Sequence, residues 1–376
     1  MELDFKCAWT GMEDTRAALD EVCPRIAQSE PSCVFFFCSP KHNLDVLARG
    51  IRDTYDCPVM ACTTAGEIVP GYGYVGGGLA AASLSSPRIK VVQEAIPDVR
   101  LLDSVAATQI RMRLMAHLGE PSETSERCFG MLLIDGMCER EEFVAATLYG
   151  ALGGIPLIGG SAGETGDYEE THVLVDGRFC TDAAVITLFR TSLPFLLFKT
   201  DHFVRRDERF VVTRAEPEKR RLLEINGIAP VDFYLEQTGV TREKFSALHA
   251  SRNPLLLPVG SQHYARGVRG IEPDGSLSMF CAVEEGIVLR LGRPVDIVAD
   301  LERQREAIEA VVPNHRVTLG FDCFYRKLDI LAGNQGNPMH RAIDNLRLFG
   351  FNTYGEQFNG LHINQTLTGV ALGAPS

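Results

Sequence analysis

A four-residue pattern occurs three times in this chain: a hydroxyl residue, any residue, glycine and glutamate. The copies are residues 64–67 (TAGE), 161–164 (SAGE) and 353–356 (TYGE), and each follows a short apolar run. About thirty residues before each Gly-Glu pair another hydrophobic run ends, which is the length of one β-α-β unit. The sequence therefore predicts duplicated β-α-β modules, and we expect their equivalent turns to converge and form a pocket.

The earlier hydrophobic runs, residues 34–38, 131–135 and 317–323, are predicted strands. Apolar residues at helical spacing follow these runs. Strand-like runs rich in small residues follow the glutamates. This order predicts an α/β (α+β) fold with mixed sheets flanked by helices. From about Ser192 the pattern changes to short strands and then to predicted helices in a charged stretch, residues 216–248. We therefore predict two halves, residues 1–191 and 192–376, with internally repeated modules.

Charge and hydropathy narrow the classes of partner. The formal net charge of −12 over 376 residues disfavours nucleic acid and anionic membranes, which both need a basic face. The basic run of residues 219–221 is interpreted as solvated helix surface. The chain opens without a signal-peptide pattern, and its most apolar long window, residues 185–198, contains Arg190 and Pro194. We expect a cytoplasmic protein.

The eleven cysteines follow no metal-binding spacing. Without an export signal they are expected to be reduced thiols, many of them buried as small hydrophobic residues. No C-x-x-C occurs in the chain, so the spacing argues against a structural zinc site.

The last predicted strand, residues 361–372, carries the strongest signal for a ligand site. Period-two alternation would place His362, Asn364, Thr366 and Thr368 on one polar face close to the third Gly-Glu pair. The alternative is a half-exposed edge strand whose polar face is wet. The predicted ligand-binding residues, including the glutamates of the other turns, are Gly355, Glu356, His362, Asn364, Thr366, Glu67 and Glu164.

Three glycines and one serine in the repeated turns give further expectations. If the turns are equivalent, at least two of Gly66, Gly163 and Gly355 should have positive φ. Residues 159–163 match the hydrolase motif G-x-S-x-G, which would make Ser161 a nucleophile. Its counterparts in the other copies are threonines, so a structural hydroxyl is favoured and a hydrolase remains the third alternative.

Several segments together resemble a known family, the FIST sensory domain. The segments are residues 62–68, 158–163, 181–184, 352–356 and 362–366, and the resemblance covers nearly the whole chain as an N-terminal and a C-terminal half. It implies an intracellular, non-enzymatic signal-input protein for small ligands. Stand-alone members of this size are similar to the nitric-oxide-sensing NosP proteins, which bind haem and regulate a partner histidine kinase.

The resemblance implies haem b as the cofactor, since the chain lacks the C-x-x-C-H of covalent haem. The alternative candidates for the iron ligand are His362, the first choice, His172 and His340. Candidate partners for the haem propionates are Arg178, Arg326 and Arg341.

Other readings of the resemblance stay open. A FIST sensor of an amino acid or other metabolite would use Glu356, His362 and Asn364 as polar anchors without haem. The partner would be a histidine kinase or another signalling protein, and a homodimer is an open alternative. Because the chain has no kinase, cyclase or DNA-binding motif, we expect output through protein contact, with residues 216–248 as the surface.

Overall fold

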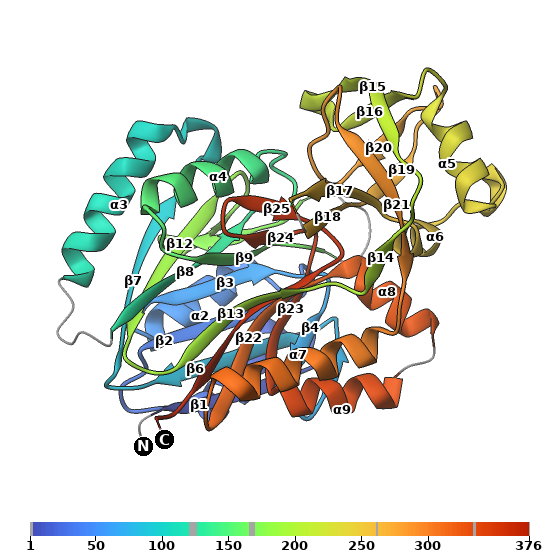
Figure 1. Ribbon diagram of the computed structural model, residues 1–376. Helices are drawn as coiled ribbons and strands as arrows, with labels where there is room; N and C mark the ends of the chain where they lie inside the picture. The colour runs from blue at the N-terminus through green and yellow to red at the C-terminus, as the bar shows by residue number, and fades with distance from the viewer. Residues whose placement is uncertain (1–2, 120–125, 165–169, 261, 334–335, 376) are drawn as a thin grey trace.

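Three six-stranded mixed sheets and one eight-stranded sheet organise the chain (Figure 1). The computed structural model describes residues 3–119, 126–164, 170–260, 262–333 and 336–375. Each six-stranded sheet is built around one copy of the same module, so the predicted α/β class with repeated β-α-β modules is confirmed.

The first two modules have the same order of elements: strand, helix, strand, helix, strand, two-stranded hairpin, strand. The first consists of β1 (Asp4–Thr10), α1 (Thr15–Ile26), β2 (Cys33–Cys38), α2 (Leu44–Thr54), β3 (Val59–Thr63), β4 (Glu67–Val69), β5 (Gly73–Val75) and β6 (Leu79–Ser85). The second consists of β7 (Ile89–Ile96), α3 (Ser104–Leu118), β8 (Arg127–Ile134), α4 (Glu141–Leu152), β9 (Leu157–Ser161), β10 (Val173–Val175), β11 (Arg178–Cys180) and β12 (Ala184–Thr191).

The third module keeps this order but carries a large insertion after its first strand, and two helices stand where the other modules have their second helix. It consists of β13 (Phe195–Thr200), α7 (Ile297–Val311), β22 (His315–Cys323), α8 (Phe324–Ala332), α9 (Gly336–Leu346), β23 (Leu348–Thr353), β24 (Glu356–Phe358), β25 (Leu361–Ile363) and β26 (Leu367–Gly373). The predicted division at residues 191 and 192 lies between β12 and β13.

Each module gives its hairpin to the sheet of another module. β4 pairs with β23 of the third module, β10 with β3 of the first, and β24 with β9 of the second. The hairpin always follows the hydroxyl-x-Gly-Glu turn, so the repeated turn is the point where the chain leaves one sheet for the next. This exchange joins the three modules into one body.

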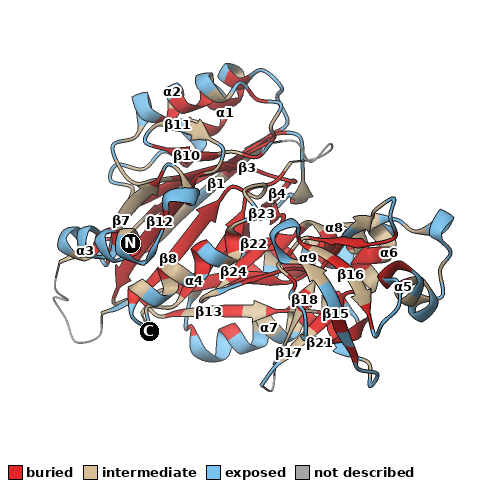
Figure 2. Cartoon of the chain, turned by 90° about the horizontal axis from the view of Figure 1, so that it is seen from above, coloured by how far each residue is buried: buried red, intermediate tan, exposed pale blue. Residues whose placement is uncertain are grey.

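The inner faces of the three sheets enclose a single apolar core, and helices cover the outer faces (Figure 2). In β2, Phe35 and Phe37 face this core, whereas Phe36 packs outward against α1 and α2. The ring centroids of Phe37 and Phe351, which belong to the first and third sheets, lie 4.6 Å apart. Because both faces of β2 are covered, the strand is a continuous hydrophobic run. Each buried Phe contributes about 2–3 kcal/mol.

The insertion in the third module, residues 203–294, is called the inserted domain. It consists of β14 (Phe203–Arg205), β15 (Phe210–Glu216), β16 (Arg221–Ile225), α5 (Pro230–Thr238), α6 (Ala247–Arg252), β17 (Leu255–Val259), β18 (Gln262–Arg266), β19 (Val268–Ile271), β20 (Leu277–Met279) and β21 (Val288–Pro294). The charged stretch of residues 216–248 lies here, outside the repeated modules as predicted. The prediction of helices across it is right for α5 but wrong for β16, which pairs with β15 and β20.

The predicted final strand, residues 361–372, is two strands instead of one. β25 belongs to the second module's sheet and β26 to the third's, and the chain turns between them at Gln365, whose φ is +57°. The expected alternation therefore does not extend from His362 to Thr368. Both side chains are nevertheless buried, so the alternative of a wet edge strand is wrong.

The helices of the structure are short. The longest of those described, α3 and α7, have 15 residues each, whereas a membrane-spanning helix needs about 20 apolar residues. Within the described residues, no helix has both the length and the apolar character needed to cross a bilayer.

Candidate functional site

The three repeated turns meet at the centre of the body, as predicted. Backbone hydrogen bonds join them directly, from Ala65 N to Asn352 O (3.0 Å), from Gly163 N to Thr63 O (3.0 Å) and from Ser161 N to Gly355 O (2.8 Å). Each of these hydrogen bonds therefore joins the turns of two modules that also share an exchanged hairpin.

The glycines of these turns are required for two different reasons. Only Gly66 has positive φ, at +130°, so the expectation of at least two such glycines is wrong for Gly163 and Gly355. A Cβ on Gly163 would lie 2.9 Å from the amide nitrogen of Ala65, and one on Gly355 would lie 2.2 Å from His362 Cε1. These two glycines are needed because neighbouring atoms occupy the space of a side chain.

Two of the three glutamates are bonded inside their own turns. Thr64 Oγ1 donates to Glu67 Oε1 at 2.8 Å, and Thr353 Oγ1 donates to Glu356 Oε1 at 2.5 Å. In the second copy, Glu164 instead accepts a hydrogen bond from the Tyr354 hydroxyl at 3.2 Å. In two modules the motif thus stabilises its own turn by a hydrogen bond between the hydroxyl and the glutamate. Glu67, Glu164 and Glu356 do not converge on one ligand.

The carboxyl group of Glu356 is fully engaged. Thr366 donates to Glu356 Oε2 through its backbone N (3.1 Å) and its Oγ1 (2.7 Å). Burial raises the pKa of Glu356 to about 8 despite these donors, and burial raises the pKa of Glu67 to about 7 although Thr64 and Lys327 oppose the shift. Glu356 and Thr366 therefore stabilise the turn between β25 and β26.

His362 and Asn364 lie where the inserted domain meets the body. Arg266 Nη1 donates to His362 O at 3.0 Å, and Gly267 N donates to Asn364 Oδ1 at 3.2 Å. We call this contact zone the seam. Of the seven predicted ligand-binding residues, these two face the inserted domain directly, because β25 ends beside β18.

The imidazole of His362 is buried and half satisfied. Gln357 Nε2 lies 3.1 Å from His362 Nδ1 and also donates to Ser161 Oγ at 3.0 Å. His362 Nε2 has no hydrogen-bond partner among the described residues. Burial lowers the pKa of His362 to about 4, although Glu142 and the backbone of Phe280 oppose the shift. The ring is neutral near pH 7, and a neutral imidazole is the form that binds metals.

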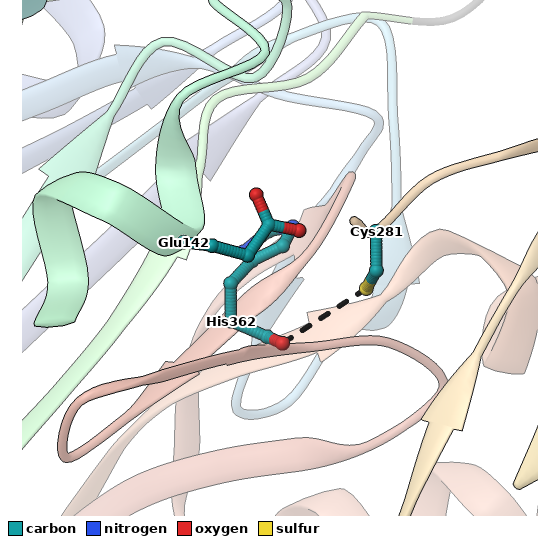
Figure 3. Close-up of side chains that lie close together, drawn as sticks. All are labelled: Glu142, Cys281 and His362. Carbon is teal, nitrogen blue, oxygen red and sulfur yellow. Dashed lines mark hydrogen bonds between the residues drawn. The ribbon is translucent and has the colours of Figure 1, made fainter. Parts of the chain in front are cut away.

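Three side chains of ligand type come together at the seam: Glu142, Cys281 and His362 (Figure 3). Glu142 lies in the first turn of α4, Cys281 follows β20, and His362 lies in β25. One ligand atom from each lies within 4.8 Å of the other two. Burial raises the pKa of the Cys281 thiol to about 12.

Neither Glu142 nor Cys281 was predicted from the sequence. Their segments are far apart in the chain and carry no recognisable spacing. The only signal was the pair of acids at the start of the helix now seen as α4.

Arg220 ties the inserted domain to the same helix. Its guanidinium contacts Glu141 and donates to Glu142 Oε2 at 2.6 Å, and its residue is only 7% exposed. Burial disfavours the charge on Arg220, but the two carboxylates hold its pKa above the ordinary value. The interpretation of residues 219–221 as solvated helix surface is therefore wrong for Arg220.

The three candidate haem ligands lie in separate places. His172 precedes β10, outside any strand, and its Nε2 is 3.7 Å from Glu170. His340 lies in α9 with its side chain 41% exposed, 3.3 Å from Asp344. Only His362 belongs to the central contact zone. That one of them binds haem iron stays a prediction.

The residues at the seam do not fit a haem. The cavity described there has a volume of about 20 Å³, whereas sites for drug-sized ligands need about 300 Å³ or more. Cavities of 460 and 540 Å³ lie beside α1, and none of the three histidines is among their described lining residues. Arg326, a candidate propionate partner, is fully buried and bonded to Asp322 at 2.6 Å.

Ser161 does not have the surroundings of a nucleophile. It is completely buried, and its Oγ accepts from Gln357. A serine nucleophile needs a base within hydrogen-bond reach. Here the side-chain amide of Gln357 lies between Ser161 and His362, so the geometry gives no support to a hydrolase.

Two family models match the chain. The FIST N domain matches residues 32–228, and the FIST C domain matches residues 230–359. The junction between the matches lies inside the inserted domain, between β16 and α5. A search of curated proteins found no match.

Proposed function

This chain belongs to the FIST family of signal-transduction sensor domains, and on that basis we propose that it senses a small ligand at the seam and signals through its inserted domain. The observation that carries the proposal is His362 Nε2, a buried nitrogen with no partner in the described part of the chain. It lies where inserted domain and body meet. A ligand that engages this nitrogen would act directly on the contact between the two parts.

The seam is held by polar contacts, which suits a movable junction. Ala282 N donates to Glu142 Oε1 at 2.6 Å, and Arg220 joins the same carboxylate. Polar interfaces between parts of one chain commonly allow relative motion. The inserted domain is connected to the third module at two places, between β13 and β14 and between β21 and α7. A change at the seam can therefore alter its orientation.

Helix α8 couples the inserted domain to the repeated turns. Tyr325 packs in the core of the inserted domain, and its hydroxyl donates to Val268 O at 2.8 Å. Two residues later, Lys327 Nζ donates to Ala65 O in the first turn at 2.9 Å. Movement of the inserted domain would thus be transmitted to the centre of the body, and its outer surface would present the change to a partner protein.

Hydrogen exchange on the full-length chain tests this proposal. The probes are haemin, with and without nitric oxide, and the twenty amino acids offered singly. A probe that binds should change exchange in α4, β20 and β25, and His362→Ala should abolish the effect. His117→Ala, an exposed histidine in α3, should retain it. Binding that survives His362→Ala would contradict the proposal.

Haem-based sensing of nitric oxide, with a histidine kinase as partner, is a finer form of the proposal. It is supported by the resemblance of the sequence motifs, and the small volume of the seam cavity, which Arg220, Phe280 and Tyr354 line, counts against it. Its test is the absorption spectrum of the ferrous, haemin-loaded protein with and without nitric oxide. Replacing His362, His172 or His340 by Ala should change that spectrum for one of the three. If none does, the expected iron ligation is wrong.

Sensing of an amino acid or another metabolite without haem is the second candidate. Of its three expected anchors, His362 and Asn364 face the inserted domain, whereas Glu356 is engaged by Thr353 and Thr366.

All eleven cysteines are free thiols, which supports a reducing compartment such as the cytoplasm. The homodimer stays a prediction.

A further inference from the structure

We infer that Glu142, Cys281 and His362 form a binding site for a single divalent cation of the zinc class. The inference goes beyond the proposed sensing role and does not depend on it. The three side chains come from α4, from the inserted domain and from β25. Figure 3 shows them close together, with the Cys281 thiol directed at the backbone oxygen of His362.

The ligand atoms are close to the spacing that a zinc ion needs. They lie within 4.8 Å of one another, and tetrahedral zinc with bonds of about 2.0–2.3 Å separates its ligands by roughly 3.5 Å. Adjustments of about 1 Å by the side chains would close the site. A single ion needs no cavity of the size that a porphyrin requires.

The unpartnered nitrogen is an independent observation that points to a ligand. A buried nitrogen without a partner requires an explanation. His362 Nε2 makes no hydrogen bond of standard geometry within the described residues, although the backbone of Phe280 lies close enough to the ring to raise its pKa. An ion on Nε2 leaves the proton on Nδ1. Gln357 Oε1 also lacks a described partner, and a half-turn of this amide would present it to that proton. Histidine ligands are commonly oriented in this way.

The charges around the site can balance. Binding would release the thiol proton of Cys281, and the thiolate with the Glu142 carboxylate would neutralise a divalent ion. Arg220 and Ala282 N donate to Glu142 and hold its oxygens in place, while Glu141 offsets the charge of Arg220. Arg266 adds one positive charge nearby, on the carbonyl of His362. One sulfur, one nitrogen and one oxygen favour zinc over magnesium or calcium.

A bound ion would join the inserted domain, through Cys281, to helix α4 of the second module and to strand β25 of that module's sheet. It would act as a clamp across the seam. Because the ion would occupy His362 Nε2, it would exclude an organic ligand from that nitrogen and would limit the motion on which the sensing proposal relies.

Metal titration of the full-length, metal-free protein tests the inference. We expect one Zn²⁺ per chain by elemental analysis, and Co²⁺ should give thiolate-to-cobalt charge transfer with tetrahedral visible bands. Cys281→Ser should remove the charge-transfer band, and Glu142→Gln should weaken binding more than about 10-fold. Cys128→Ser, a partly buried thiol of β8, should change neither. A band that survives Cys281→Ser would overturn the inference.

X-ray absorption on the unaltered chain keeps the test open if a variant does not fold. One sulfur at about 2.3 Å with nitrogen and oxygen ligands is the expected zinc environment. A zinc environment without sulfur, or with several sulfurs, would overturn the inference, as would the absence of stoichiometric binding.

Discussion

Gly355 packs so closely against the imidazole of His362 that a methyl group has no room there. We expect Gly355→Ala to displace the ring and lower the free energy of unfolding by about 1–3 kcal/mol. Gly150→Ala is the matched control, because this α4 glycine has open space around it and alanine should stabilise the helix by up to about 1 kcal/mol. Urea denaturation measures both changes. Equal stability of Gly355→Ala and the unaltered chain would refute the steric argument.

The buried carboxyl of Glu356 predicts a specific pH dependence. Its folded pKa of about 8 lies above its ordinary value of 4.5, so between these values the folded chain holds a proton that the unfolded chain has released. Its stabilising contribution is complete below pH 4.5 and is lost as the pH rises through 8. Glu67 acts in the same direction up to about pH 7.

Unfolding free energies measured from pH 5 to 8 test this dependence. Each unit of separation between the folded and unfolded pKa corresponds to about 1.4 kcal/mol. The fall in stability should be smaller in Glu356→Gln than in the unaltered chain, and Glu13→Gln on the exposed surface should leave it unchanged. A fall of the same size in both variants would show that Glu356 does not bind the proton.

The sequence identified some central residues but not the seam. The hydroxyl-x-Gly-Glu repeat marked Glu67 and Glu356, because each hydrogen bond lies within four residues. Glu142 and Cys281 meet His362 only through the packing of distant elements. Cysteine spacing reveals only metal sites whose ligands are close together in the sequence. The sequence argument against zinc therefore does not apply to Glu142, Cys281 and His362, which are far apart in the chain.

Among the elements, the exchanged hairpin β4–β5 makes a prediction about cooperativity. Ile68 in β4 is fully buried with residues of α7 and α9, which belong to the third module. Ile68→Ala should cost about 2–5 kcal/mol and should reduce hydrogen-exchange protection in β22 and β23. Ile51→Ala in α2, buried within the first module, should act mainly on β2 and β3. Loss of protection confined to the first module in both variants would contradict the exchange.

Element prediction succeeded where burial covers both faces of a strand. Residues 34–38, 131–134 and 317–323 lie in β2, β8 and β22, because apolar runs are expected where helices and core cover opposite faces. It failed at residues 364–366, where the chain passes from one sheet to another. Hydrophobic periodicity reports burial along a strand and contains no information on which sheet the strand joins.

For the whole molecule, Arg220 predicts how the inserted domain is attached. Arg220→Met would leave Glu141 as a buried carboxylate without its ion-pair partner, which typically costs about 3–5 kcal/mol. Glu142, which is partly exposed, would keep the hydrogen bond from Ala282 N. We expect faster exchange at the seam and easier proteolysis of the inserted domain. Lys219→Met, with its side chain 67% exposed, is the control and should behave like the unaltered chain. Charge-reversal tests of the output surface must therefore spare Arg220.

The central claim is that binding at the seam repositions the inserted domain on the three-module body. Electron-electron distance measurements test it most directly, with spin labels on noncanonical residues at exposed Val259 and Leu101, so that native thiols stay unlabelled. For any probe shown to bind, the account predicts a shifted distance distribution in the unaltered chain and no shift in His362→Ala. An unchanged distribution with the probe bound to the unaltered chain would contradict it.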